Sequence, residues 1–163
     1  MANAKVGVKS GWHSNFVETI TEAKTLVPGD SGKLFDITAG AYAITLPKAE
    51  ADLTGFYCEF VVTTGSTGAL TIDSNRAADL YYGGLIAVTG IVASTSNATN
   101  GRFYQPDGSD DNTLTIDNDT ATFGGDKGSH VKFQCIGANK WLVSGHLMVS
   151  TAEDDQTDLA WFS

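Results

Sequence analysis

The sequence FYCEFVVT, at residues 56–63, alternates apolar and polar side chains along one short segment. The apolar residues at even positions from Phe56 to Val62 share one side, and only Val61 interrupts the polar opposite side. A period of two is the pattern of a half-buried β-strand, because successive side chains of a strand point to opposite faces of its sheet. This segment therefore predicts a strand with one face in a core.

Other segments repeat the pattern. We expect strands at Leu34 to Thr38, at Tyr42 to Leu46 and at His130 to Ile136. The one helical turn expected in the first half of the chain lies at Lys48 to Leu53, and Gly55 ends it. The sequence therefore predicts an all-β chain.

The residues after the last of these strands predict a hairpin with a defined register. If Gly137 to Asn139 form a three-residue loop, with the asparagine in the left-handed conformation, Cys135 lies opposite Trp141. A two-residue loop would instead set the apolar Phe133 against Ser144. We expect the first register, because it matches the apolar faces of the two strands.

Both cysteines lie on apolar strand faces. We expect Cys58 and Cys135 to be reduced thiols in the core, with a disulfide possible only if their strands are neighbours. The same alternation predicts that Phe60, Phe133 and Trp141 belong to one buried core.

Length and charge narrow the class of protein. A chain of 163 residues can form one domain with its own core. Its 10 basic and 19 acidic residues give a formal net charge of −9, which would repel a phosphate backbone, so we expect no nucleic-acid partner. No secretory signal is recognisable before Asn15, and no apolar run is long enough to span a bilayer. We therefore expect synthesis in a cytoplasm and no membrane partner.

The chain divides into three expected parts. Residues 1–15 read as an extended N-terminal arm, 16–149 as one β domain, and 150–163 as an acidic C-terminal tail with an aromatic end. For the domain we expect an antiparallel β-sandwich or a jelly-roll-like fold. The sequence Leu-Thr-Ile-Asp at 70–73 recurs at 114–117, which hints at two related half-sheets.

Recognisable catalytic chemistry is missing from the sequence. It carries none of the short motifs of common hydrolases, nucleotide-binding proteins or zinc sites. His13, His130 and His146 are its only histidines, so we expect no enzyme. The hairpin register sets His130 opposite His146, a pair that could share a metal ion. We predict no carboxylate beside them on either strand, and therefore no metal site.

A group of aspartates offers a second possible cation site. Asp107, Asp110, Asp111, Asp117 and Asp119 gather the oxygen ligands that calcium prefers. Their spacing fits no EF-hand loop, and Asp-rich turns are common because these side chains stabilise turns. We expect a solvated loop without a cofactor, so that a chelator changes neither folding nor oligomeric state.

Three strand-and-turn signatures, in a fixed order, carry a resemblance to a known group of proteins. They are Ile44–Pro47 followed by Gly55–Phe60, then Leu70–Asp73, then Val131–Cys135 with its hairpin partner Trp141–Gly145. In this order the chain resembles small bacteriophage virion proteins, namely head decoration (cement) proteins and the related β domains of head and tail fibres. The resemblance implies a non-enzymatic structural protein on the capsid surface of the virion, bound to the major capsid protein. Low charge and faces rich in Ser and Thr agree with assembly as a homotrimer.

The two arms are the expected capsid-docking elements. Val6, Val8 and Trp12 could pair along an exposed strand edge of a capsid subunit, while Trp161 and Phe162 fill a pocket beside it. The aromatic end could also pack on the chain's own core or on a sister subunit.

The alternative reading is a receptor- or glycan-binding module of a head or tail fibre. The stretch from Thr95 to Asn112 is rich in turn residues and predicts long loops. Nearby, Tyr81, Tyr82, Phe103 and Tyr104 could stack on sugars. Because Tyr81 and Tyr82 are adjacent, one of them should be buried if this segment is a strand.

Overall fold

The computed structural model shows a chain whose regular structure is almost entirely β. It describes residues 16–37, 40–65, 67–89, 102–107, 109–117, 124–149 and 162–163. Its strands are β1 (Val17–Ile20), β2 (Lys24–Thr25), β3 (Leu34–Ile37), β4 (Ala43–Thr45), β5 (Tyr57–Val62), β6 (Leu70–Asp73), β7 (Leu80–Thr89), β8 (Arg102–Tyr104), β9 (Thr113–Ile116), β10 (His130–Gly137) and β11 (Lys140–Val149). Two short 3-10 helices accompany them, η1 (Pro28–Asp30) and η2 (Ala51–Leu53). None of the described helices is long or apolar enough to cross a bilayer.

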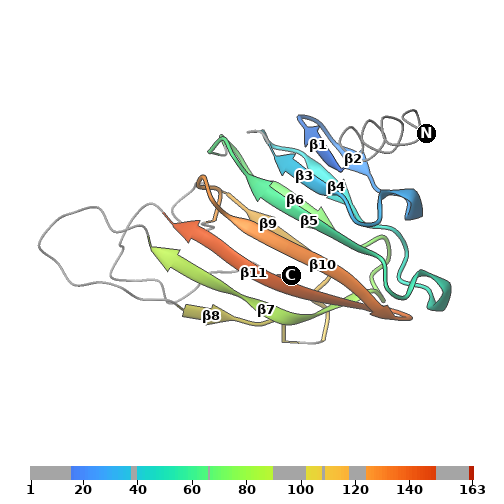
Figure 1. Cartoon of the computed structure of the whole chain (residues 1–163). Coiled ribbons are helices and arrows are strands. Elements are labelled where there is room, and N and C mark those ends of the chain that lie inside the picture. The colour runs from blue at the N-terminus through green and yellow to red at the C-terminus, as the bar shows by residue number, and fades with distance from the viewer. Residues whose placement is uncertain are drawn as a thin grey trace, which may run out of the picture.

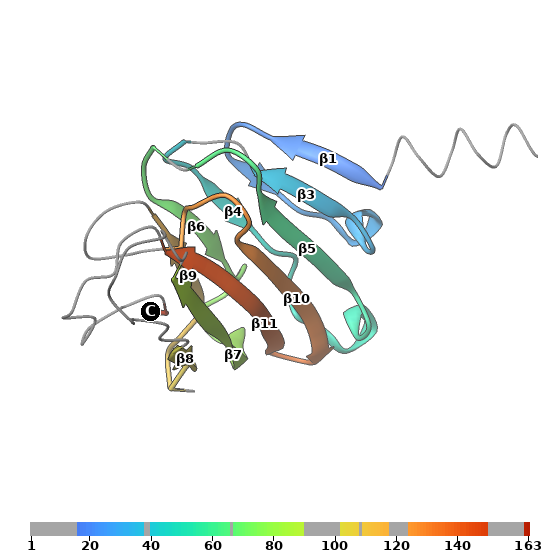
Figure 2. The ribbon, with the colours of Figure 1, turned by 60° about the vertical axis from the view of Figure 1, so that its left-hand side comes forward.

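The strands form two sheets, and both sheets are mixed. The larger has the order β1-β3-β5-β10-β11-β7-β8 and the smaller β2-β4-β6-β9. Figures 1 and 2 show the smaller sheet lying behind the larger one. From β1 to β6 the chain changes sheet at every connection, so consecutive strands of one sheet are separated by a strand of the other and run parallel. The all-β class is confirmed, whereas the expected antiparallel pairing is wrong for this half of the chain.

One core lies between the two sheets. Residues of both sheets that point inward belong to a single buried cluster. Phe60 stacks on Phe35 with ring centroids 5.4 Å apart, and Phe133 meets Phe60 edge to face at 5.9 Å. The Tyr81 hydroxyl on the larger sheet donates a 2.8 Å hydrogen bond to the Ile72 carbonyl on the smaller. Phe60, Phe133 and Trp141 are all buried, which confirms the predicted core.

The hairpin of β10 and β11 has the predicted register, with Cys135 opposite Trp141. Its loop is shorter than predicted, because Gly137 pairs with Lys140 and only two residues close the turn. An irregularity between Cys135 and Gly137 restores the register that the shorter loop would have shifted. Asn139 has φ +60°, the expected left-handed conformation.

The two cysteines are buried and free, as expected. Their strands, β5 and β10, are neighbours, but Cys58 lies opposite Phe133 rather than Cys135. Burial raises the pKa of the Cys58 thiol, so the thiol stays protonated at neutral pH. Both side chains therefore act as small apolar groups of the core.

Other sequence expectations hold less completely. The repeated Leu-Thr-Ile-Asp segments form adjacent antiparallel strands of one sheet, β6 and β9, rather than parts of two half-sheets. The expected long loop from Thr95 to Asn112 contains β8, which pairs with β7 at the edge of the larger sheet. The helical turn is the 3-10 helix η2, and Gly55 follows it with φ +97°.

Candidate functional site

An exposed apolar surface lies on the outer side of the larger sheet. Tyr82 and Ile86 on β7 and Phe103 on β8 are 37%, 47% and 62% exposed, and we call these three residues the apolar face. Phe103 lies directly opposite Ile86 in the antiparallel pair. A Cβ on Gly84 would lie 2.5 Å from the Phe103 ring, so this ring rests on the glycine. Figure 2 shows β7 and β8 at one edge of the sheet.

The structure separates the four aromatic residues proposed for glycan binding. Tyr81 is fully buried in the core, which confirms that one member of the Tyr81/Tyr82 pair points inward. Tyr104 lies opposite Leu85 and packs against the core. Only Tyr82 and Phe103 are exposed, so the candidate stacking surface is reduced to two rings.

A polar cluster occupies the middle of the same outer face. We call His130, His146, Glu59 and Lys132 the histidine cluster. His130 Nε2 lies 3.1 Å from Glu59 Oε2, and Lys132 Nζ lies 3.7 Å from Glu59 Oε1. His146 Nε2 lies 3.0 Å from the Gly128 carbonyl oxygen, to which it donates. The expected opposition of His130 and His146 is confirmed, with ring centroids 6.0 Å apart.

The prediction of no carboxylate beside the histidines covers only the two strands that carry them. The carboxylate beside His130 comes from a third strand, β5. Glu59 belongs to β5, which pairs with β10 on the side away from β11. Alternation in the sequence does place Glu59 on an outward face. The pairing of β5 with β10 spans about seventy residues of chain, and no local pattern reveals it.

The aspartate group is partly assembled. Carboxylate oxygens of Asp107, Asp110 and Asp111 all lie within 4.8 Å of one another. The Ser109 side chain and its backbone N–H both donate to Asp107 and lower the pKa of that carboxyl. Asp111 accepts a hydrogen bond from the Asp107 backbone, so these carboxylates organise their own turn. Asp117 lies at the end of β9, bridged to Gly124, and Asp119 lies outside the described residues.

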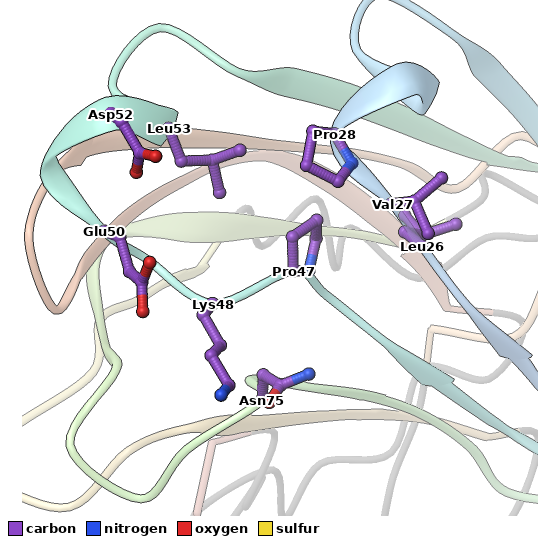
Figure 3. Close-up of a pocket in the computed structure, with 9 residues that line it drawn as sticks. All are labelled: Leu26, Val27, Pro28, Pro47, Lys48, Glu50, Asp52, Leu53 and Asn75. Carbon is purple, nitrogen blue, oxygen red and sulfur yellow. The ribbon is translucent and has the colours of Figure 1, made fainter.

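A shallow groove opens where three parallel strands of the smaller sheet end. Segments that follow β2, β4 and β6 meet there, and η2 forms its far wall (Figure 3). Its volume is about 340 Å³, and it is lined by Leu26, Val27, Pro28, Pro47, Lys48, Glu50, Asp52, Leu53 and Asn75. Prolines and aliphatic side chains form an apolar floor, with charged groups at one side (Figure 3). No local sequence pattern predicts this groove, because its walls come from segments far apart in the chain.

Phe162, at the aromatic end of the chain, is built into the fold. Phe162 bridges to Leu114, and its ring lies 6.3 Å from that of Tyr81. The Ser163 carbonyl accepts hydrogen bonds from the backbone of Asn112 and Thr113 at 2.8 and 2.7 Å. Of the three expected locations for this end, the structure places Phe162 on the chain's own core.

The remaining proposed docking residues and one histidine fall outside the described part of the chain. They are Val6, Val8, Trp12, His13 and Trp161. The docking roles of Val6, Val8, Trp12 and Trp161 stay predictions.

No family model matches the chain, and no match was found among curated proteins or solved structures.

Proposed function

We propose that this chain is a non-enzymatic decoration protein of a bacteriophage head. It binds the major capsid protein from the outside of the capsid and stabilises the junctions between capsid subunits. Its two sheets make a sandwich whose large outer face is available for contact. The order of the strand-and-turn signatures, which resembles that of phage decoration and fibre proteins, supports this assignment.

The apolar face is the observation that carries the proposal. Tyr82, Ile86 and Phe103 expose apolar surface on neighbouring strands, and a partner that covered them would gain about 25 cal/mol for each Å² removed from water. Buried aromatic and aliphatic anchors of this kind dominate the energy of protein interfaces. The strands beneath them belong to a packed sheet, so little conformational freedom is lost on binding. Many identical contacts over a capsid add up to resistance against internal pressure.

Co-sedimentation with capsids tests the proposal. Ile86→Asp places a charge at the centre of the apolar face and should weaken capsid binding by at least about tenfold. Thr19→Asp is the matched control, because it adds the same charge to an exposed polar position on β1, at the other edge of the sheet. Equal binding by both variants and the unaltered chain would contradict a capsid contact at this face.

We also propose that the chain assembles as a homotrimer. Light scattering should then give a mass near three times 17.1 kDa. If Ile86→Asp lowers this mass and Thr19→Asp does not, the apolar face holds sister subunits together. A monomer at micromolar concentration would contradict the trimer.

A glycan-binding fibre module is the second candidate. It is favoured by the two exposed rings of Tyr82 and Phe103 on one face. A fibre module should bind host cells or their polysaccharide, whereas a decoration protein should bind capsids stoichiometrically and ignore cells. Replacing both rings with Ala should abolish glycan binding if this candidate is correct.

A further inference from the structure

We infer that His130, His146 and Glu59 form a binding site for Zn²⁺ on the outer face of the larger sheet. His130 on β10 lies between His146 on β11 and Glu59 on β5, and all three side chains point outward. Two imidazoles and a carboxylate form a ligand set that zinc takes, with a fourth position left for water. This inference does not depend on capsid decoration.

The spacing between His130 and Glu59 already suits a shared ion. In a tetrahedral site with bonds of 2.0 to 2.1 Å, two ligand atoms lie about 3.3 Å apart. The observed separation of His130 Nε2 and Glu59 Oε2 is 3.1 Å. A zinc ion could therefore replace the hydrogen bond between these two atoms with little movement of either side chain.

The second imidazole lies beside the first but must move to complete the site. Two rings bound to one tetrahedral ion have centroids roughly 5 Å apart. The rings of His130 and His146 are 6.0 Å apart and tilted by 36°, so His146 must rotate toward His130 to bring its nitrogen to the ion. That rotation breaks one hydrogen bond, the 3.0 Å contact from Nε2 to the Gly128 carbonyl.

The surroundings hold the ligands in place. Lys132 is drawn to Glu59 Oε1 and lies over the Tyr57 ring, 4.7 Å from its centroid, which leaves Oε2 directed at His130. Such outer contacts orient metal-binding carboxylates. Gly145 allows β10 and β11 to approach closely beside the histidines, because a Cβ there would lie 2.2 Å from the His130 carbonyl oxygen. The site thus lies on three paired strands in the middle of the sheet.

Titration of the full chain with Zn²⁺ by calorimetry, together with imidazole nitrogen NMR, tests the inference. One Zn²⁺ should bind per chain, with nitrogen shifts at His130 and His146. His146→Asn and the isosteric Glu59→Gln should each weaken binding by about tenfold or more. Zn²⁺ should raise the melting temperature of the unaltered chain but not of His146→Asn, and EDTA should reverse this rise.

Three control variants exclude other ligands. Asp36→Asn removes a carboxylate from β3 of the same sheet, Asp110→Asn alters the aspartate turn, and His13→Asn removes the remaining histidine. All three should bind Zn²⁺ as the unaltered chain does. The inference is overturned if His146→Asn and Glu59→Gln, shown to be folded by their amide spectra, bind zinc undiminished. It is equally overturned if the unaltered chain shows no binding at millimolar Zn²⁺.

Discussion

Phe133 stands at the centre of the aromatic core. It contacts Phe60 at 5.9 Å and Tyr81 at 5.2 Å, so it joins rings from β5, β10 and β7. Its side chain is fully buried. Removing the ring therefore leaves a cavity that three strands border.

Phe133→Ala should lower the free energy of unfolding by about 3 to 5 kcal/mol, through lost transfer energy and the cavity left behind. Urea denaturation of the two proteins measures this difference. Ile136→Ala on the same strand is the control, because Ile136 is 44% exposed, and its change should stay within about 0.5 kcal/mol. A similar loss for both variants would show that the core does not centre on Phe133.

An ion network joins the first strand to η1. Lys33 lies 2.6 Å from Asp30 and 2.9 Å from Glu18, and Lys24 also binds Glu18. Hydrogen bonds from Lys24 and Lys33 lower the pKa of Glu18. At Asp30 burial raises the pKa, but the hydrogen bonds from Lys33 and the Val27 backbone outweigh burial and leave the pKa lowered. Both carboxyls are therefore easier to ionise in the folded chain.

Stability from this network should be fully present above the ordinary carboxyl pKa values of about 4. It should be lost as the pH falls through the lower values of the folded state, because protonation then removes the ion pairs. Lys33→Met should lower the free energy of unfolding at pH 7 by about 1 kcal/mol and flatten this acid dependence. Lys127→Met, at an exposed turn position, should leave the acid profile as it is. Urea denaturation between pH 2 and pH 7 decides between these outcomes.

At the scale of elements, the hairpin at one end of the larger sheet is fixed by one asparagine. Asn139 adopts φ +60°, and its N–H donates to the Ala49 carbonyl at 2.7 Å. Its side-chain oxygen accepts a 3.0 Å hydrogen bond from Arg76. The turn is thereby tied to the segments before η2 and after β6.

Comparing Asn139→Ala with Asn139→Gly separates backbone conformation from side-chain bonding. Both variants lose the hydrogen bond from Arg76, but only alanine is strained at positive φ. The alanine variant should be less stable than the glycine variant by about 1 kcal/mol, as measured by thermal or urea unfolding. Equal stabilities would mean that the turn relaxes to another conformation.

The C-terminal residues act as an added strand segment beside β9. Phe162 is half-buried against the core, so Phe162→Ser should cost about 1 to 2 kcal/mol of unfolding free energy. Phe103→Ser is the matched control, since that ring is 62% exposed and should contribute much less. Chemical denaturation that ranks Phe103→Ser as the more damaging change would contradict the role of Phe162.

The buried faces of single strands and the register of the hairpin were predictable from the sequence. Which distant strands pair with each other was not. Alternation predicted the buried faces of β5 and β10, and matching of apolar faces predicted the register of Cys135 with Trp141. The parallel pairing of β3 with β5 could not be predicted, because it depends on β4 crossing to the other sheet. The same limit explains why the contact of Glu59 with His130 went unrecognised.

At the scale of the whole molecule, the first described residue shows where the N-terminal residues join the sheet. The Phe16 carbonyl accepts a 2.8 Å hydrogen bond from the Leu34 N–H, beside β1 at the sheet's edge. This edge is at the opposite end of the strand order from β8, which carries Phe103. Attachment through residues 1–15 and attachment through the apolar face can therefore be tested separately.

Deleting residues 1–12 removes Val6, Val8 and Trp12 but keeps Phe16 and its bond to Leu34, so the two sheets should stay folded. If these residues pair along a capsid strand edge, the deletion should abolish co-sedimentation with capsids while the amide spectrum of the domain is unchanged. Ordering such a segment lowers the affinity of each contact, which many copies on a capsid offset. Full occupancy of capsids by the deletion variant, together with lost binding by Ile86→Asp, would assign attachment to the apolar face alone.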